Sequence, residues 1–227
     1  MKKIVIFTGA GVSVESGLPT FRGTDGLWEG HRIEEVATPE AWQRNPELVQ
    51  RFYNQRRKDC MRVIPNAAHR YFAELEQDYD VHVITQNIDD LHERAGSSSV
   101  LHLHGEIRKA QSSKDAGLVY PIAGDEIKMD SVCELGSPLR PHVVWFGEAV
   151  PNMVPAAKLV EEADVFIVAG TSLQVYPAAN LLYHCKPGCQ IIIVDPNAKQ
   201  LAIPANVIKI PHSATKAIDY LAEILSK

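Results

Sequence analysis

The sequence predicts an α/β fold built on a doubly wound, mostly parallel sheet, with one small inserted lobe. Short runs of β-branched and apolar residues, such as 80–84, alternate along the chain with helical patterns, as in a parallel sheet covered by helices. The runs 2–7 and 164–169 pass directly into glycine-rich turns, which is typical of ligand-binding loops in such folds. Segments of approximately 25–65 and 108–140 do not follow the alternation, and together they predict the lobe.

The strands are expected where short apolar runs are bounded by turn signals. In chain order they are 2–7, 80–84, 100–103, 164–169, 190–194 and 206–210. The α/β pattern also returns at 143–146, after the lobe. We therefore divide the chain into a sheet domain, approximately 1–25, 66–107 and 143–227, and an inserted lobe, approximately 26–65 and 108–142.

Helix starts are indicated by capping residues. Thr38-Pro39 and Asn45-Pro46 each combine a side-chain cap with proline at the first helical position, and the second pair opens a helix through about Lys58. Residues 108–139 contain glycines and serines that break any periodicity, which predicts a loop-rich segment with two short strands. Further helices are expected from Val12 or Ser13, from about Pro65, and after Ser213 as the cap of a C-terminal helix.

Composition argues against several classes of protein. The formal net charge of −5 disfavours a general nucleic-acid or membrane-surface binder, although the basic residues of segment 51–62 could face a substrate. No apolar run approaches the ~20 residues of a membrane-spanning helix. The chain enters a strand at once, so we expect no signal peptide, and its four cysteines form no CxxC pair. We therefore expect a cytoplasmic protein that binds neither membranes nor nucleic acid.

Glycine-rich turns follow two of the expected strands. Gly9-Ala10-Gly11 fits a phosphate-binding turn, because glycine lets the backbone approach a pyrophosphate and a helix N-terminus offers unpaired N–H groups. Val14 stands where the usual dinucleotide pattern has a third glycine, so an ordinary tight turn is the alternative. Gly170-Thr171-Ser172 indicates either a second ligand-binding turn or a helix cap. Asp195 ends the next strand, where a carboxylate could accept from a ribose hydroxyl.

The most informative motif is Thr85-Gln86-Asn87-Ile88-Asp89, followed fifteen residues after Asp89 by His104-Gly105. Both motifs lie just past strand ends, where open α/β sheets bind ligands. The alternatives are that Asn87 and Asp89 form a turn and that His104 is structural, or that His104 and His102 form a metal pair on one strand face. Phe21 and Arg22, in the loop 16–23, could cover a ligand and pair with phosphate, or could belong to a plain surface loop.

The order of these motifs resembles the sirtuin family of NAD-dependent protein deacylases, over most of the chain from Gly9 to about Asn197. The resemblance rests on six ordered blocks: Gly-Ala-Gly-Val-Ser, Ser-Gly-Leu-Pro-Thr-Phe-Arg-Gly, Thr-Gln-Asn-Ile-Asp, His-Gly, Leu-Arg-Pro-His-Val-Val-Trp-Phe-Gly-Glu beginning at Leu139, and Gly-Thr-Ser-Leu. It implies a Rossmann-like sheet domain with a small inserted lobe, in agreement with the pattern above.

The resemblance also implies a reaction. Sirtuins consume NAD as a co-substrate and act on acylated lysine side chains of proteins, giving free lysine, nicotinamide and O-acyl-ADP-ribose. In this chain His104 would be the general base, a role that suits an imidazole because its pKa lies near neutrality. Asn87 would hold the ribose and a water molecule, and Asp89 would hold the nicotinamide carboxamide.

A larger set of residues is implied around NAD and the substrate peptide. Phe21 would shield the reacting centre from water, and Arg22 would bind pyrophosphate and ribose. The peptide would pair as an added strand with the segment 143–148, which includes Val143, Phe146, Gly147 and Glu148. The implied cofactor residues are Gly9, Ala10, Gly11, Val12, Ser13, Glu15, Ser16, Thr20, Phe21, Arg22, Trp28, Gln86, Asn87, Ile88, Asp89, His104, Gly170, Thr171, Ser172, Val175, Asp195, Pro196, Asn197 and Ala214.

Two features depart from the commonest family pattern. Most sirtuins hold zinc with two CxxC pairs in the lobe, whereas here that stretch contains only Cys133, and tetrahedral zinc needs four ligands. We therefore predict that the lobe is stable without metal. Tyr53 and Arg56 lie three apart on one helical face and resemble a pair that receives succinyl, malonyl or glutaryl groups in a subset of sirtuins. A solvated helix face beside Arg57 and Lys58 is the alternative.

We therefore expect an NAD-dependent deacylase that removes succinyl and malonyl groups and also accepts acetyl groups. Protein ADP-ribosylation and non-catalytic NAD binding are the alternative functions. The presence of Asn87, Asp89 and His104 argues against both, because enzymes of the first kind often lack the Asn or His and a binding module needs no base. A collapsed zinc-free lobe would favour the non-catalytic module.

Overall fold

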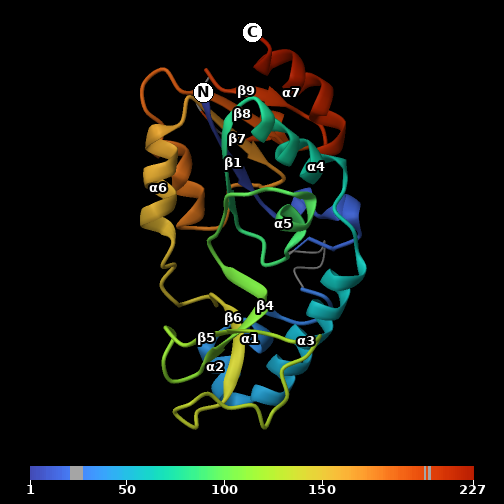
Figure 1. Cartoon of the computed structure of the whole chain (residues 1–227), viewed down its shortest axis with the longest axis vertical. Coiled ribbons are helices and arrows are strands. Elements are labelled where there is room, and N and C mark those ends of the chain that lie inside the picture. Colours follow the sequence, from blue (N-terminus) through green and yellow to red (C-terminus); the bar gives the residue numbers. More distant parts are fainter. Residues whose placement is uncertain (21–27, 202, 204–205) are drawn as a thin grey trace.

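The computed structural model describes residues 1–20, 28–201, 203 and 206–227. Its main element is a six-stranded sheet in the order β3-β2-β1-β7-β8-β9, in which every neighbouring pair is parallel (Figure 1). This confirms the predicted α/β fold and its six strands. Their bounds are β1 (Lys3–Thr8), β2 (Asp80–Thr85), β3 (Val100–His102), β7 (Val165–Ala169), β8 (Gln190–Val194) and β9 (Ile208–Ile210).

Helices cover both faces of this sheet, so successive side chains of β1 enter two different cores. Ile4 and Ile6 pack with residues of α4 (Ala67–Glu74) and α7 (Ile218–Leu225). Val5 and Phe7 pack with residues of α6 (Met153–Glu162) and of η4 (Ala178–His184), a 3₁₀ helix. Figure 1 shows α6 on one side of the sheet and α4 and α7 on the other. Burial on both faces explains why the strands read as continuous apolar runs.

A second, antiparallel sheet of three strands lies with α1, α2 and α3 in the lower part of Figure 1. Two short strands were expected here. The run 143–146 was expected to resume the α/β pattern, and this expectation is wrong. Val143 is the last residue of β6 in the antiparallel sheet, and Trp145 packs into a third hydrophobic core, separate from the two cores beside the six-stranded sheet. The elements are α1 (Ile33–Val36), α2 (Pro39–Arg44), α3 (Pro46–Arg62), β4 (Gly105–Ser112), β5 (Val119–Pro121) and β6 (Leu139–Val143).

The two predicted proline-flanked caps are confirmed. The Thr38 hydroxyl accepts a hydrogen bond of 3.0 Å from the Ala41 N–H, and the Asn45 carboxamide oxygen accepts one of 3.1 Å from the Leu48 N–H. The second cap opens α3, which continues to Arg62, past the predicted end at Lys58.

Two other helix starts differ from prediction. A helix was expected from Val12 or Ser13, but residues 10–16 form two 3₁₀ turns, η1 (Ala10–Val12) and η2 (Val14–Ser16). Gly17, with a φ of +103°, follows the second turn. Ser213 does not cap a helix with its side chain, because α7 begins at Ile218 after η6 (Thr215–Ala217) and the Ser213 hydroxyl has no hydrogen-bond partner among the described residues. The remaining elements are η3 (Leu75–Gln77), α5 (Leu91–Ala95) and η5 (Ala198–Gln200).

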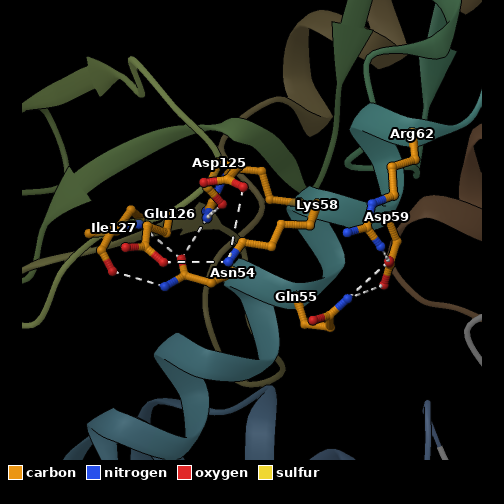
Figure 2. Close-up of polar contacts among 9 residues, drawn as sticks. Asn54, Gln55, Lys58, Asp59, Arg62, Asp125, Glu126 and Ile127 are labelled. Atoms are coloured by element: carbon orange, nitrogen blue, oxygen red, sulfur yellow. Dashed lines mark hydrogen bonds and ion pairs between the residues drawn. The ribbon is translucent and has the colours of Figure 1, made fainter.

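Helix α3 holds the segment 125–127 of the lobe by side-chain contacts (Figure 2). The Asn54 carboxamide accepts from the Ile127 N–H at 2.9 Å and donates to the Ile127 carbonyl at 2.9 Å. Lys58 lies 3.5 Å from the Glu126 carboxylate and 4.0 Å from that of Asp125, and these exposed ion pairs contribute little. The paired amide is the stronger constraint, because it satisfies both backbone groups of one residue.

Candidate active site

A cavity of about 480 Å³ lies where turns at the carboxyl ends of four parallel strands face the lobe. Such turns converge because parallel strands end at one edge of the sheet. Most of the predicted site residues line this cavity: Gly9, Ala10, Gly11, Ser13, Thr20, Trp28, Tyr53, Arg56, Gln86, Asn87, Ile88, Asp89, His104, Val143, Phe146, Gly147, Glu148, Gly170, Thr171, Ser172, Val175, Asp195 and Asn197.

Some predicted cofactor residues lie elsewhere. The Glu15 carboxylate accepts a hydrogen bond of 2.7 Å from the Thr215 hydroxyl, and the Ser16 hydroxyl accepts one of 3.0 Å from Asn66. Phe21 and Arg22 lie outside the described residues. The predicted cofactor residues that are described but do not line the cavity are Val12, Glu15, Ser16, Pro196 and Ala214.

The turn after β1 packs directly against the turn after β7. The Gly11 N–H donates to the Gly170 carbonyl at 2.9 Å, and a Cβ on Gly11 would lie 2.8 Å from the Gly170 Cα. Gly170 has a φ of +63°, and a Cβ there would lie 2.4 Å from the Val12 nitrogen. Only glycine tolerates these approaches, which bring two main-chain turns together at the cavity wall.

Side chains from the turns after β1 and β2 interlock in a buried polar centre. The Asn87 amide nitrogen donates to the Gly9 carbonyl and to the Ser13 hydroxyl, both at 3.1 Å. Ser13 in turn donates to the Asp89 carboxylate at 3.0 Å. Burial raises the pKa of Asp89, while its hydrogen bonds from Leu91 and Ser13 act in the opposite direction. The amide and the carboxylate are thus fixed relative to the glycine turn.

The His104 ring is held by a hydrogen bond from its Nδ1 atom to the main chain. Its Nδ1 lies 3.0 Å from the Gln86 carbonyl, which can only accept, so Nδ1 carries the proton. The neutral ring therefore has an unprotonated Nε2. Burial lowers the pKa of His104, against the raising effect of this hydrogen bond, so the neutral form is favoured. His104 consequently has the state that a general base requires.

His102 does not share the cavity with His104. Its ring nitrogens contact the Asn87 carbonyl at 2.9 Å and the Glu93 carboxylate at 2.7 Å, so both are already engaged within the protein. Across the described ranges, no group of three or more His, Cys, Asp or Glu residues is arranged to hold a metal ion.

The lobe side of the cavity contains the predicted acyl-recognition pair on α3. The Tyr53 hydroxyl accepts a hydrogen bond of 3.1 Å from the Trp145 indole, and burial raises the pKa of Tyr53. The Arg56 side chain is 9% exposed and forms an ion pair with Glu29. Its guanidinium also lies over the Trp28 ring, 5.1 Å from the centroid. A buried cation with aromatic neighbours therefore faces the cavity.

The predicted peptide-binding segment already uses three of its N–H groups in hydrogen bonds within the protein. The N–H groups of Val144, Trp145 and Phe146 donate to His104, Glu148 and Ala37, respectively. Glu148 also accepts from Arg140 at 2.7 Å. A peptide strand added here would consequently find the N–H groups of Val144, Trp145 and Phe146 already engaged.

Several cavity residues were missed by sequence reasoning. Cys60 follows Tyr53 and Arg56 at helical spacing, and this spacing could have identified it. Burial raises the pKa of Cys60 to about 12, so it remains a neutral thiol. Val144 and Trp145 also line the cavity and belong to the predicted peptide segment 143–148, although neither was given a role of its own. The other missed wall residues include Leu18, Pro19, Ala37, Val150, Gln174, Tyr176 and Pro177.

The residues present fit the NAD that the sequence resemblance implies. The N–H groups of Gly9, Gly11 and Gly170 are engaged within the protein, so the main-chain donors that these turns offer to phosphates are those of Ala10, Thr171 and Ser172. Thr171 and Ser172 also add hydroxyls. At the end of β8, Asp195 and Asn197 supply a carboxylate and an amide for polar groups of a nucleoside. Burial raises the pKa of Asp195.

Comparisons with known proteins agree on one family. Residues 9–177 match the model described as the Sir2 family. An NAD-dependent protein deacylase from Helicobacter pylori strain 26695 is 52% identical over 97% of this chain and 96% of its own length. One from Aggregatibacter actinomycetemcomitans is 54% identical over 87% of this chain and 95% of its own. A solved Sir2 homologue–NAD complex is 43% identical with a TM-score of 0.88, covering 99% of this chain and 90% of that one.

Proposed function

This chain belongs to the Sir2 family and is an NAD-dependent protein deacylase, and we propose that it acts preferentially on lysine side chains carrying acidic acyl groups such as succinyl or malonyl. Acetyl-lysine would be a weaker substrate. Bound NAD would supply the ribose that accepts the acyl group, with nicotinamide and O-acyl-ADP-ribose as products. We also propose that residues of approximately 26–65 and 108–142 form one inserted lobe, and that the predicted site residues bind NAD and the acyl-lysine peptide.

The observation that carries the proposal is the position of Arg56 in the cavity wall. Its guanidinium is nearly buried, lies beside Trp28, and shares the α3 face with the Tyr53 hydroxyl. A guanidinium presents a planar fork of donors that matches a carboxylate in bidentate fashion. A succinyl or malonyl group ends in a carboxylate, whereas an acetyl group would leave this cation without a ligand partner.

The polar centre supports the catalytic half of the proposal. His104, through its unprotonated Nε2, would take a proton from a ribose hydroxyl. Asn87 is oriented by Gly9 and Ser13, and the Ser13 hydroxyl also binds Asp89. In this arrangement Asp89 would hold the carboxamide of nicotinamide as a hydrogen-bond acceptor.

Nicotinamide release from NAD tests the proposal when measured with three peptides of one sequence, bearing succinyl-, acetyl- or unmodified lysine. We expect release that requires an acyl group and is fastest with succinyl-lysine. Release without any acyl-lysine, with ADP-ribose appearing on the protein, would indicate ADP-ribosyl transfer instead. Binding of NAD without release under any condition would indicate a non-catalytic module.

A further inference from the structure

Three successive carbonyl groups of the turn after β2 are bound by residues between the last residue of β3 and the first half of β4. His104 Nδ1 lies 3.0 Å from the Gln86 carbonyl, and His102 Nδ1 lies 2.9 Å from the Asn87 carbonyl. The Ile107 N–H donates to the Ile88 carbonyl at 2.7 Å. The turn that carries the polar centre is therefore tethered residue by residue, and His102 forms its middle tether.

The second ring nitrogen of His102 identifies the charge state of this tether. Nε2 lies 2.7 Å from the Glu93 carboxylate, while Nδ1 faces a carbonyl. Both partners are acceptors when Glu93 is ionised, so both ring nitrogens must donate, and a ring that donates twice is an imidazolium. The His102 side chain is only 7% exposed and that of Glu93 is 40% exposed. The positive charge of His102 is thus buried, and the partly exposed Glu93 carboxylate neutralises it.

The surrounding charges are consistent with an ion pair. Burial lowers the pKa of His102, but the hydrogen bond and charge of Glu93, the Asn87 carbonyl and Glu106 raise it above its ordinary value. Burial raises the pKa of Glu93, but His102 and Lys109 bring it below its ordinary value. The remaining titratable neighbours affected by His102 are His92 and His142, whose pKa values it lowers, and Asp89, whose ionised form it favours.

We propose that His102 and Glu93 form a charged positioning pair, which holds the Asn87 main chain so that its side chain keeps its contacts with Gly9 and Ser13. Neither residue touches the cavity, so the pair acts through Asn87 and not on the substrate. This inference rests on the proposed function, because its consequence for turnover requires that Asn87 serve the deacylation reaction.

Substitutions at His102 separate positioning from general stability. His102→Ala removes the donor to the Asn87 carbonyl, whereas His102→Asn can place an amide N–H near the position of Nδ1. We expect kcat to fall roughly tenfold to a hundredfold in His102→Ala, since small misplacements of a reacting group have effects of this size. The KM for NAD should change little, and His102→Asn should recover part of the loss. His82→Asn is the matched control, because His82 pairs with Asp80 and Ser99 away from the cavity.

The charge state has its own readout, which does not depend on turnover. Nitrogen chemical shifts of ¹⁵N-labelled histidine at pH 7 should show His102 protonated on both nitrogens in the wild type. In Glu93→Gln they should show a neutral ring, because the amide can donate to Nε2 while Nδ1 still donates to Asn87. A neutral His102 in the wild type would overturn the charged pair.

The kinetic outcomes are equally decisive. Near-normal kcat in His102→Ala, or equal loss in His102→Ala and His102→Asn at unchanged thermal midpoints, would overturn the positioning role. If His102→Ala fails to fold, His102→Asn and Glu93→Gln carry the test. A wild type that consumes no NAD with any acyl-lysine peptide would contradict the proposed function, and the nitrogen shifts would still decide the state of the pair.

Discussion

Arg56 forms an ion pair with Glu29 of the same chain at the lobe side of the cavity. Glu29 has a φ of +50° and lies in a two-residue turn closed by mutual backbone hydrogen bonds between Trp28 and His31, 2.9 and 3.0 Å long. A non-glycine residue rarely adopts this conformation, so the turn holds the carboxylate at some conformational cost. Glu29 thus binds one of the guanidinium nitrogens of Arg56 to which the carboxylate of an acidic acyl group would bind.

Glu29→Gln should increase kcat/KM for a succinyl-lysine peptide by about tenfold, because a carboxylate that competes with the substrate is replaced by a neutral amide. Activity on the matching acetyl-lysine peptide should change little. Glu40→Gln, an exposed residue of α2, is the control. A decrease in desuccinylation in Glu29→Gln would show instead that Glu29 helps to hold Arg56 in place.

His104→Ala should retain NAD binding and lose turnover by about 10² to 10⁴, the usual contribution of a positioned base. The base works when unprotonated, and burial lowers the pKa of His104. Activity of the wild type should therefore persist as pH falls to the ordinary histidine pKa of about 6.5, and decline only below it. Calorimetric NAD binding and a pH profile of kcat check both statements. Near-normal turnover in His104→Ala would exclude His104 as the base.

The lobe should be stable without metal, so treatment of tag-free protein with a chelator should leave the thermal midpoint unchanged. Asn54→Ala should lower the free energy of unfolding by about 1–3 kcal/mol, because it leaves the Ile127 N–H without its acceptor, although the Ile127 carbonyl still accepts from Gln50. Gln55→Ala, which only loses contacts with Asp59 on the same helix, should stay within about 0.5 kcal/mol. One zinc per chain by elemental analysis would contradict the account.

The sequence predicted the parallel sheet well because its central strands β1, β7 and β8 are apolar on both faces and each ends in a distinct turn. It did not predict α5, which spans only Leu91–Ala95 and has no side-chain cap. The glycine turns and the Asn87–Asp89 motif were found because they follow strand ends directly. Glu29 and Glu93 were missed because no local pattern marks them, and each acts through a partner that only the tertiary fold brings near.

The central claim is that Arg56 reads a carboxylate on the acyl group. The most direct measurement is the ratio of kcat/KM for succinyl- and acetyl-lysine peptides of one sequence, in the wild type, in Arg56→Met and in the control Arg62→Met at the exposed end of α3. Hydrogen bonds to charged groups contribute roughly 1.5–3 kcal/mol, so the wild type should prefer succinyl-lysine by about tenfold to a hundredfold. Arg56→Met should lose most of that preference while Arg62→Met keeps it. A wild type that prefers acetyl-lysine, or an Arg56→Met variant that loses both activities equally, would contradict the account.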